Sequence, residues 1–275
     1  MGERLTGVVP GLPEDDYRSY PAFSASEAKV ILDSPARYEW EYLKGNRVEK
    51  SAFDVGSAVH AKVLGVGHDV AVLDFDNYRT KAAQDARKEA RDAGRIPMLA
   101  HEMAPVDAMA EAVLAHGMAR RLLEIPGQPE VSVFADADGL PVKCRFDYLP
   151  DAGPITVDLK TTAGSASPAG FAKAAADHLY HVQRGHYLDV LERATGRVAE
   201  MVFIVVEKQA PYLVGVHQID REFADMGEVE MRAARDLYRR CLESGVWPGY
   251  PETINLVQPP VYAIYQHQDK FGENQ

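Results

Sequence analysis

Apolar and polar residues alternate in three consecutive segments in the middle of the chain. These are residues 130–134, 142–149 and 155–162, and the turns between them, residues 136–139 and 150–154, are rich in Gly, Pro and Asp. Strict alternation bounded by turn residues is typical of half-buried strands joined by short connections. The pattern therefore predicts a three-stranded meander, and similar apolar runs predict further strands over residues 200–207 and 212–219.

Helical periodicity surrounds these strands. Ser24 and Glu27 have the spacing of a capping box, and helices are expected from there, from Pro35, over residues 53–64, through most of the Ala-rich stretch 76–124, and over 171–176, 178–194 and 221–244. We expect irregular chain over the first twenty or so residues and over the proline-rich residues 251–275. The prediction is a single mixed α/β domain over residues 1–250, in which a helical N-terminal part (20–125) precedes a sheet core (128–245) of about five strands flanked by helices.

Composition excludes several classes of protein. The longest apolar run, residues 201–206, is too short to span a bilayer, and no apolar segment follows Met1. Two cysteines, Cys144 and Cys241, cannot form a disulfide framework or a four-cysteine metal site. These features predict a cytoplasmic protein that does not associate with membranes.

The chain is acidic overall, but its charges are unevenly distributed along the sequence. The formal net charge of −11 argues against a simple basic coat for nucleic acid. Residues 76–95 are more basic, and Arg87, Arg91 and Arg95 recur every four residues, which would place them on one stripe of a helix. This stripe is either an ordinary solvated face or a DNA-contacting surface, and the sequence leaves both open.

The strands around residues 150–154 carry the candidate chemistry. Asp158 and Lys160 project from the same face of one strand, and a symmetric turn places Asp147 of the preceding strand opposite Asp158. The same register pairs Tyr148 with Val157. Opposed carboxylates repel, so Asp158→Asn is expected to leave the metal-free protein equally stable or slightly more stable. A Mg²⁺ or Mn²⁺ ion would remove the repulsion, and Lys160 could then orient a water for attack on phosphorus.

Four ordered motifs resemble those of the PD-(D/E)XK nuclease superfamily, and most closely those of the exonuclease VIII (RecE) group of phage recombination nucleases. They are Gly56–His60, Arg145–Asp147, Asp158–Lys160 and Gln183–Tyr187. The resemblance implies a restriction-endonuclease-like core and a Mg²⁺-dependent exonuclease. It further implies that the enzyme digests the 5′ strands of duplex ends, leaves 3′ overhangs for a single-strand annealing protein, and works as a ring-shaped homo-oligomer.

The resemblance also assigns roles to residues. Asp147, Asp158, His60 and the backbone carbonyl of Leu159 would hold the metal, and Lys160, Gln183 and Tyr187 would complete the catalytic set. Apart from the resemblance, Arg145 and the stripe of Arg87, Arg91 and Arg95 are candidates for contact with DNA because of their charge.

Several alternatives stay open. The chain could be another nuclease of the superfamily, either helicase-associated or an endonuclease, or a catalytically silent module that binds DNA or a partner. Gln183 could instead cap the core, and Glu130 could be either a site acid or a strand-edge charge. The cluster of His178, His181 and His186 could bind zinc, although it lacks a cysteine and a matching Glu.

Overall fold

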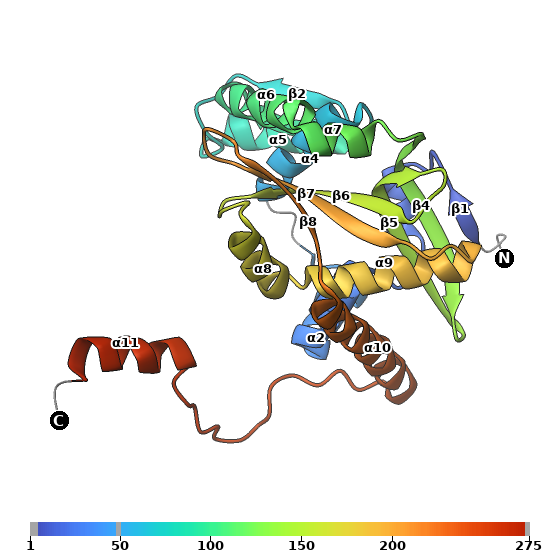
Figure 1. Ribbon diagram of the computed structural model, residues 1–275, viewed down its shortest axis with the longest axis vertical. Coiled ribbons are helices and arrows are strands. Elements are labelled where there is room, and N and C mark those ends of the chain that lie inside the picture. The colour runs from blue at the N-terminus through green and yellow to red at the C-terminus, as the bar shows by residue number, and fades with distance from the viewer. Residues whose placement is uncertain (1–4, 48–50, 273–275) are drawn as a thin grey trace.

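A six-stranded mixed sheet runs through the middle of the molecule (Figure 1). The computed structural model describes residues 5–47 and 51–272. The order of the strands in the sheet is β1-β4-β5-β6-β7-β8. They are β1 (Gly7–Val9), β4 (Gly127–Ala137), β5 (Leu140–Pro150), β6 (Ile155–Thr162), β7 (Glu200–Glu207) and β8 (Val214–Gln218).

The predicted meander is confirmed as β4, β5 and β6, which are antiparallel neighbours. After β6 the chain crosses over through two helices and returns as β7, parallel to β6, and β8 then pairs antiparallel with β7. The sixth strand is β1, which pairs with β4. We expected irregular chain there, because a three-residue strand is too short to show an alternating pattern.

Most of the helices form the layers on the two faces of this sheet, and the C-terminal helix lies apart from it. The helices are α1 (Glu14–Ser19), α2 (Ala25–Asp33), α3 (Pro35–Tyr38), η1 (Glu39–Leu43, a π-helix), α4 (Ser51–Leu64), α5 (Lys81–Asp92), α6 (Ala100–Ala115), α7 (Gly117–Leu123), α8 (Pro168–Asp177), α9 (Tyr180–Thr195), α10 (Arg221–Ser244) and α11 (Val261–Phe271). The predicted capping box is present, because the Ser24 side chain accepts from the Glu27 N–H and Glu27 accepts from the Ser24 N–H.

Two hydrophobic clusters lie on opposite faces of the sheet. One packs the sheet against α2, α9 and α10, and includes Phe146, Val182, Leu191 and Phe203. The other packs it against α4, α6 and α7, and includes Val59, Met109, Leu159 and Ile204. Figure 1 shows the same division, with α4 to α7 on one side of the sheet and α8, α9, α10 and α2 on the other.

The stretch from residue 76 to residue 124 is less helical than expected. It contains β3 (Ile96–Leu99), which pairs in parallel with β2 (Val70–Leu73) to form a separate two-stranded sheet. Pro97 interrupts the apolar run of β3 and suggested a helix break. All four β3 residues are buried, however, and helices α4, α5 and α6 pack against the strand.

The C-terminal segment also differs from the prediction. Residues 251–275 were expected to be irregular, yet α11 occupies Val261–Phe271. The prolines that suggested irregular chain lie before the helix, with Pro260 at its N-cap, where no backbone N–H has to be donated within the helix. No residue of α11 is buried, and Figure 1 shows the helix apart from the body of the molecule. Across the described residues, the structure contains no helix of the length and apolar character that a membrane crossing requires.

Candidate active site

The candidate site lies where strands β5 and β6 separate. Their ladder includes the predicted pair Tyr148 and Val157. Beside that pair the Asp147 side chain replaces a backbone bond, because its Oδ2 accepts a hydrogen bond from the Leu159 N–H at 2.6 Å. The predicted register is therefore confirmed at Tyr148–Val157, but the ladder does not extend to the predicted pair of Asp147 and Asp158, and the strands open at these two acids.

Asp147 belongs to a cluster of three potential metal ligands. One ligand atom each from His60, Glu130 and Asp147 lies within 4.8 Å of the other two. His60 comes from α4, and its Nδ1 is 3.7 Å from Asp147 Oδ2. Glu130 comes from β4, whose ladder pairs Pro129 with Tyr148 and Val131 with Phe146, so that Glu130 lies opposite Asp147. Two carboxylates and an imidazole suit a divalent cation.

The structure settles the position of Glu130, which the sequence left open. Its φ of 53° puts a non-glycine residue in the left-handed region within a strand, a conformation that costs about 1 kcal/mol or more. Burial, followed by the charge of Asp147, raises the pKa of Glu130 to about 8. Burial also raises the pKa of Asp147, and the charge of Asp158 acts in the same direction. A bound cation would relieve this crowding of acids.

Asp158 is held from the opposite face of the sheet. Its Oδ1 accepts a hydrogen bond from Gln183 Nε2 of α9 at 2.6 Å, and its Oδ2 is 2.5 Å from Lys160 Nζ. Asp158 is buried, and Lys160 is nearly so. Although burial opposes it, the charges of Asp158 and Asp147 raise the pKa of Lys160. The structure thus brings Asp147, Asp158, Lys160, His60 and Gln183 together.

Lys29 of α2 is a site residue that the sequence analysis missed. Its Nζ donates to Gln183 Oε1 at 3.1 Å and lies 5.1 Å from the centre of the Tyr180 ring. Lys160 Nζ lies 5.2 Å from the centre of the same ring. Burial and the charge of Lys160 lower the pKa of Lys29 to about 7. The sequence assigned Lys29 no role in the site, because Lys29 is far from the four motifs along the chain.

Tyr187 and Leu159 have partly structural roles. The Tyr187 ring packs edge-to-face on Phe146 with centroids 5.3 Å apart, and burial raises the pKa of its hydroxyl well above the usual value. Leu159 packs its side chain in the core and uses its N–H to hold Asp147. The predicted use of its carbonyl as a metal ligand stays a prediction.

The predicted DNA contacts of Arg145 do not match its surroundings. Its guanidinium donates to Ser132 Oγ at 2.9 Å and to the Leu12 carbonyl at 2.6 Å, and it stacks on the Tyr17 ring with 4.6 Å to the centroid. Its side chain is only 10% exposed. Arg145 therefore fastens the N-terminal segment to the sheet next to Glu130.

The arginine stripe is also interrupted. Helix α5 ends at Asp92, and Gly94 takes a positive φ, so Arg95 lies beyond the helix that carries Arg87 and Arg91. Arg87 packs over the Tyr78 ring at 4.5 Å. A straight stripe of three arginines is therefore not formed.

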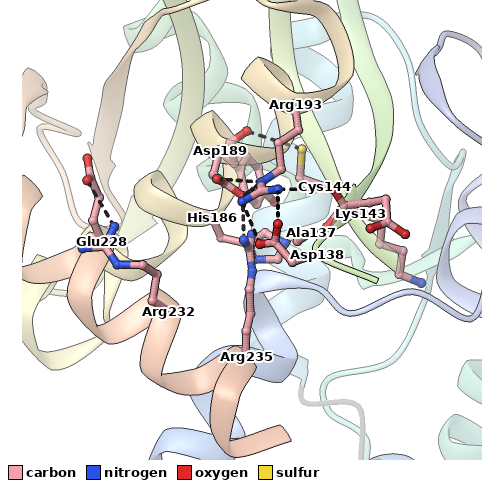
Figure 2. A network of polar contacts seen from close by, with 12 residues as sticks. Ala137, Asp138, Lys143, Cys144, His186, Asp189, Arg193, Glu228, Arg232 and Arg235 are labelled. Carbon is pink, nitrogen blue, oxygen red and sulfur yellow. Dashed lines mark hydrogen bonds and ion pairs between the residues drawn. The ribbon is translucent and has the colours of Figure 1, made fainter. Parts of the chain in front are cut away.

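The three histidines of the candidate zinc cluster have separate partners. His178 is exposed, and His181 contacts the Ala175 carbonyl and Glu230. His186 lies in a buried polar network between α9, α10 and β5 (Figure 2), where its ring nitrogens contact the Lys143 carbonyl at 3.0 Å and Arg235 at 3.2 Å. Burial and the charge of Arg235 lower the pKa of His186 to about 3, so the ring is neutral. Among the described residues, the metal-ligand grouping is instead His60, Glu130 and Asp147.

Comparisons with known proteins agree with the fold of the chain. The chain resembles in fold the crystal structure of a protein from Eubacterium rectale provisionally named an exonuclease, with a TM-score of 0.62 and 15% identity over 96% of this chain and 98% of that one. The structure of SSO0001 shares 13% identity over 82% and 81% of the two chains, and its TM-score of 0.35 is too low to carry an argument. No curated protein matches the sequence.

The match to a family model covers most of the chain. Residues 24–260 match the model described as a PDDEXK-like domain of unknown function (DUF3799). This span contains every acid of the site as well as Lys29, His60, Lys160 and Gln183. The chain therefore belongs to this family of PD-(D/E)XK nuclease-like domains.

Proposed function

We propose that this protein is a metal-dependent deoxyribonuclease that acts on the ends of duplex DNA. The observation that carries the proposal is the intact set of Asp147, Asp158 and Lys160 at the opening between β5 and β6, with His60 and Glu130 beside it. A silent binding module has no need for two buried acids and a paired lysine at one opening, because such groups cost free energy to bury.

The donor set fits Mg²⁺ or Mn²⁺, which prefer oxygen ligands. His60, Glu130, Asp147 and Asp158 would hold the cation. When bound, it supplies Lewis acidity at the phosphate and at the leaving oxygen. The chain's own residues do the rest. Lys160 orients the attacking water from its place on Asp158, and Gln183 fixes the other oxygen of that carboxylate. The Leu159 N–H holds Asp147 in place at the opening.

The finer features of the proposal come from the resemblance of the motifs to exonuclease VIII. The enzyme would digest 5′ strands, leave 3′ overhangs and pass them to a single-strand annealing protein. A ring-shaped homo-oligomer would keep an acidic protein on DNA by enclosing it. Light scattering at micromolar concentration tests the ring, and a monomer there would contradict it.

The purified protein on end-labelled linear duplex and on covalently closed circular duplex tests the proposed activity. We expect Mg²⁺ or Mn²⁺ to support degradation of the linear duplex only, and chelator to stop it. Ca²⁺ should support little turnover because its looser coordination misplaces the reacting groups. Efficient nicking of closed circles would instead indicate an endonuclease, and no cleavage with either metal would contradict the proposal.

A further inference from the structure

Lys29 occupies an unusual place for a lysine beside a nuclease-like site. It comes from α2, which packs on α9, and its ammonium reaches the Gln183 side chain and the face of the Tyr180 ring. The described residues place no carboxylate within ion-pair distance of it, whereas Lys160, which also contacts the Tyr180 ring, is paired with Asp158. A half-buried lysine whose main polar partner is a neutral amide calls for a functional explanation.

The contacts with Lys29 and Asp158 together fix which way the Gln183 amide faces. An amide has a donating NH₂ end and an accepting oxygen end of almost the same shape. An ammonium group only donates, so it requires the oxygen of Gln183 and turns the NH₂ end away from itself. That NH₂ end is the group that donates to Asp158 Oδ1 at 2.6 Å. Without Lys29, the oxygen end of the amide loses its donor, and only Asp158 would hold the Gln183 side chain in this orientation.

The carboxylate of Asp158 is consequently held at both oxygens. Gln183 donates to Oδ1, and Lys160 lies at Oδ2. We infer that Lys29 is a positioning residue, which orients Asp158 for metal binding by fixing the direction of the Gln183 amide. This inference rests on the proposed metal-dependent function of the same site and adds to it a residue that touches neither the acids nor Lys160.

Whether Lys29→Met weakens or strengthens metal binding distinguishes a positioning role of Lys29 from a purely electrostatic one. Removing a cation from the neighbourhood of a cation site favours metal binding by electrostatics. Removing a group that orients a ligand weakens metal binding, typically 10–100-fold. The two explanations therefore predict opposite changes for Lys29→Met.

The test is a double-mutant cycle on the full chain, with Mn²⁺ alone as the titrant in calorimetry. We expect Lys29→Met and Gln183→Met each to weaken Mn²⁺ binding about 10-fold. The double variant should bind no more weakly than Gln183→Met alone, because Lys29 acts through Gln183. Lys29→Arg, which also only donates, should recover most of the affinity. Lys173→Met, at an exposed lysine of α8, is the matched control and should leave affinity unchanged.

The outcomes distinguish this inference from the proposed function. Unchanged or tighter Mn²⁺ binding by Lys29→Met, or losses that multiply in the double variant, would overturn the inference. If Lys29→Met does not fold, Lys29→Gln takes its place in the cycle, since an amide there both donates and accepts and no longer fixes Gln183. A wild-type protein that shows the coupling but cuts no DNA would overturn the proposed function and leave the inference standing. A wild-type protein that cuts DNA but shows no coupling between Lys29 and Gln183 would overturn the inference and leave the proposed function standing.

Discussion

Asp147 and Asp158 carry the same group but have different surroundings. Asp147 accepts a hydrogen bond from the Leu159 N–H and has a carboxylate neighbour in Glu130, and its pKa is raised by burial. Asp158 has its own cation in Lys160 and a donor in Gln183. The repulsion expected from the sequence therefore acts mainly on Asp147. Because Asp158 has a counterion, we expect Asp158→Asn to lower the stability of the metal-free protein, and not to leave it equal or slightly higher as expected from the sequence.

The two acids should respond oppositely to substitution by asparagine in chelator at pH 7. Asp147→Asn keeps an oxygen for the Leu159 N–H and removes a buried charge, so we expect unchanged stability or a gain of up to about 1 kcal/mol. Asp158→Asn leaves Lys160 without its counterion and should cost about 2 kcal/mol. Both should lose the gain in stability that Mg²⁺ gives the wild type. Urea denaturation with and without Mg²⁺ measures this, and equal effects of the two changes would contradict the different surroundings.

Glu130 should make the metal-free protein less stable as the pH rises. Its pKa of about 8 in the folded protein lies above the ordinary value, so the folded state holds a proton that the unfolded state has lost. This contribution to stability is full below about pH 4 and disappears as the pH rises through about 8. In chelator, Glu130→Gln should raise the free energy of unfolding at pH 8 by on the order of 1 kcal/mol and leave it unchanged near pH 4. If both proteins lose stability equally with pH, another group is responsible.

Site residues were predictable from the sequence where a motif placed them and not where only the tertiary structure does. Asp147, Asp158, Lys160, His60 and Gln183 lie in ordered motifs, and the structure brings them together. Lys29 and Glu130 join them through packing of α2 on α9 and through a distortion of β4. The sequence left the role of Glu130 open and assigned none to Lys29. Arg145 was assigned to DNA, whereas in the structure its partners are the N-terminal segment, Ser132 and Glu130, so a DNA contact of Arg145 stays a prediction.

Strands and helices with a long periodic pattern of apolar residues were predictable from the sequence, and short ones were not. The meander and α10 repeat a clear period over many residues and form as expected. The short strands β1, β2 and β3 carry too few residues for a period and depend on neighbours for burial. The loss of Arg95 from the helical stripe has the same origin, because Gly94 ends α5 in a left-handed turn.

Hydrogen bonds from Lys143 of β5 hold the N-terminal segment against the sheet. Lys143 Nζ donates to the carbonyls of Tyr17, Arg18 and Tyr20, at 2.7, 3.1 and 2.7 Å, at the end of α1. Lys143→Met would leave these carbonyls without their shared donor, and we expect a loss of about 2 kcal/mol in the free energy of unfolding. Faster proteolysis within residues 5–20 should accompany it. Lys173→Met is the matched control, and equal stability of the two variants would show that the fastening contributes little.

At the scale of the whole molecule, the C-terminal segment is separate from the body. Trp247 stacks on Tyr38 with ring centroids 5.3 Å apart, and the Ala36 N–H donates to the Pro248 carbonyl at 3.1 Å. Beyond these contacts α11 buries no residue. Removing residues 251–275 should therefore change the melting temperature by less than about 2 °C, whereas a truncation that also removes Trp247 should lower it by several degrees. A large loss from the shorter truncation would show that α11 packs on the body.

We propose above that DNA is cleaved at the opening between β5 and β6. The most direct measurement is the Mg²⁺-dependent release of nucleotides from end-labelled linear duplex by the wild type, Lys160→Gln and Lys173→Gln. Gln at position 160 can still donate to Asp158 but lacks the charge, and the exposed Lys173 lies outside the site. We predict that Lys160→Gln loses at least about 100-fold in rate while Lys173→Gln keeps the wild-type rate. Wild-type activity in Lys160→Gln, or no Mg²⁺-dependent release by the wild type, would show that DNA is not cleaved at this opening by the proposed residues.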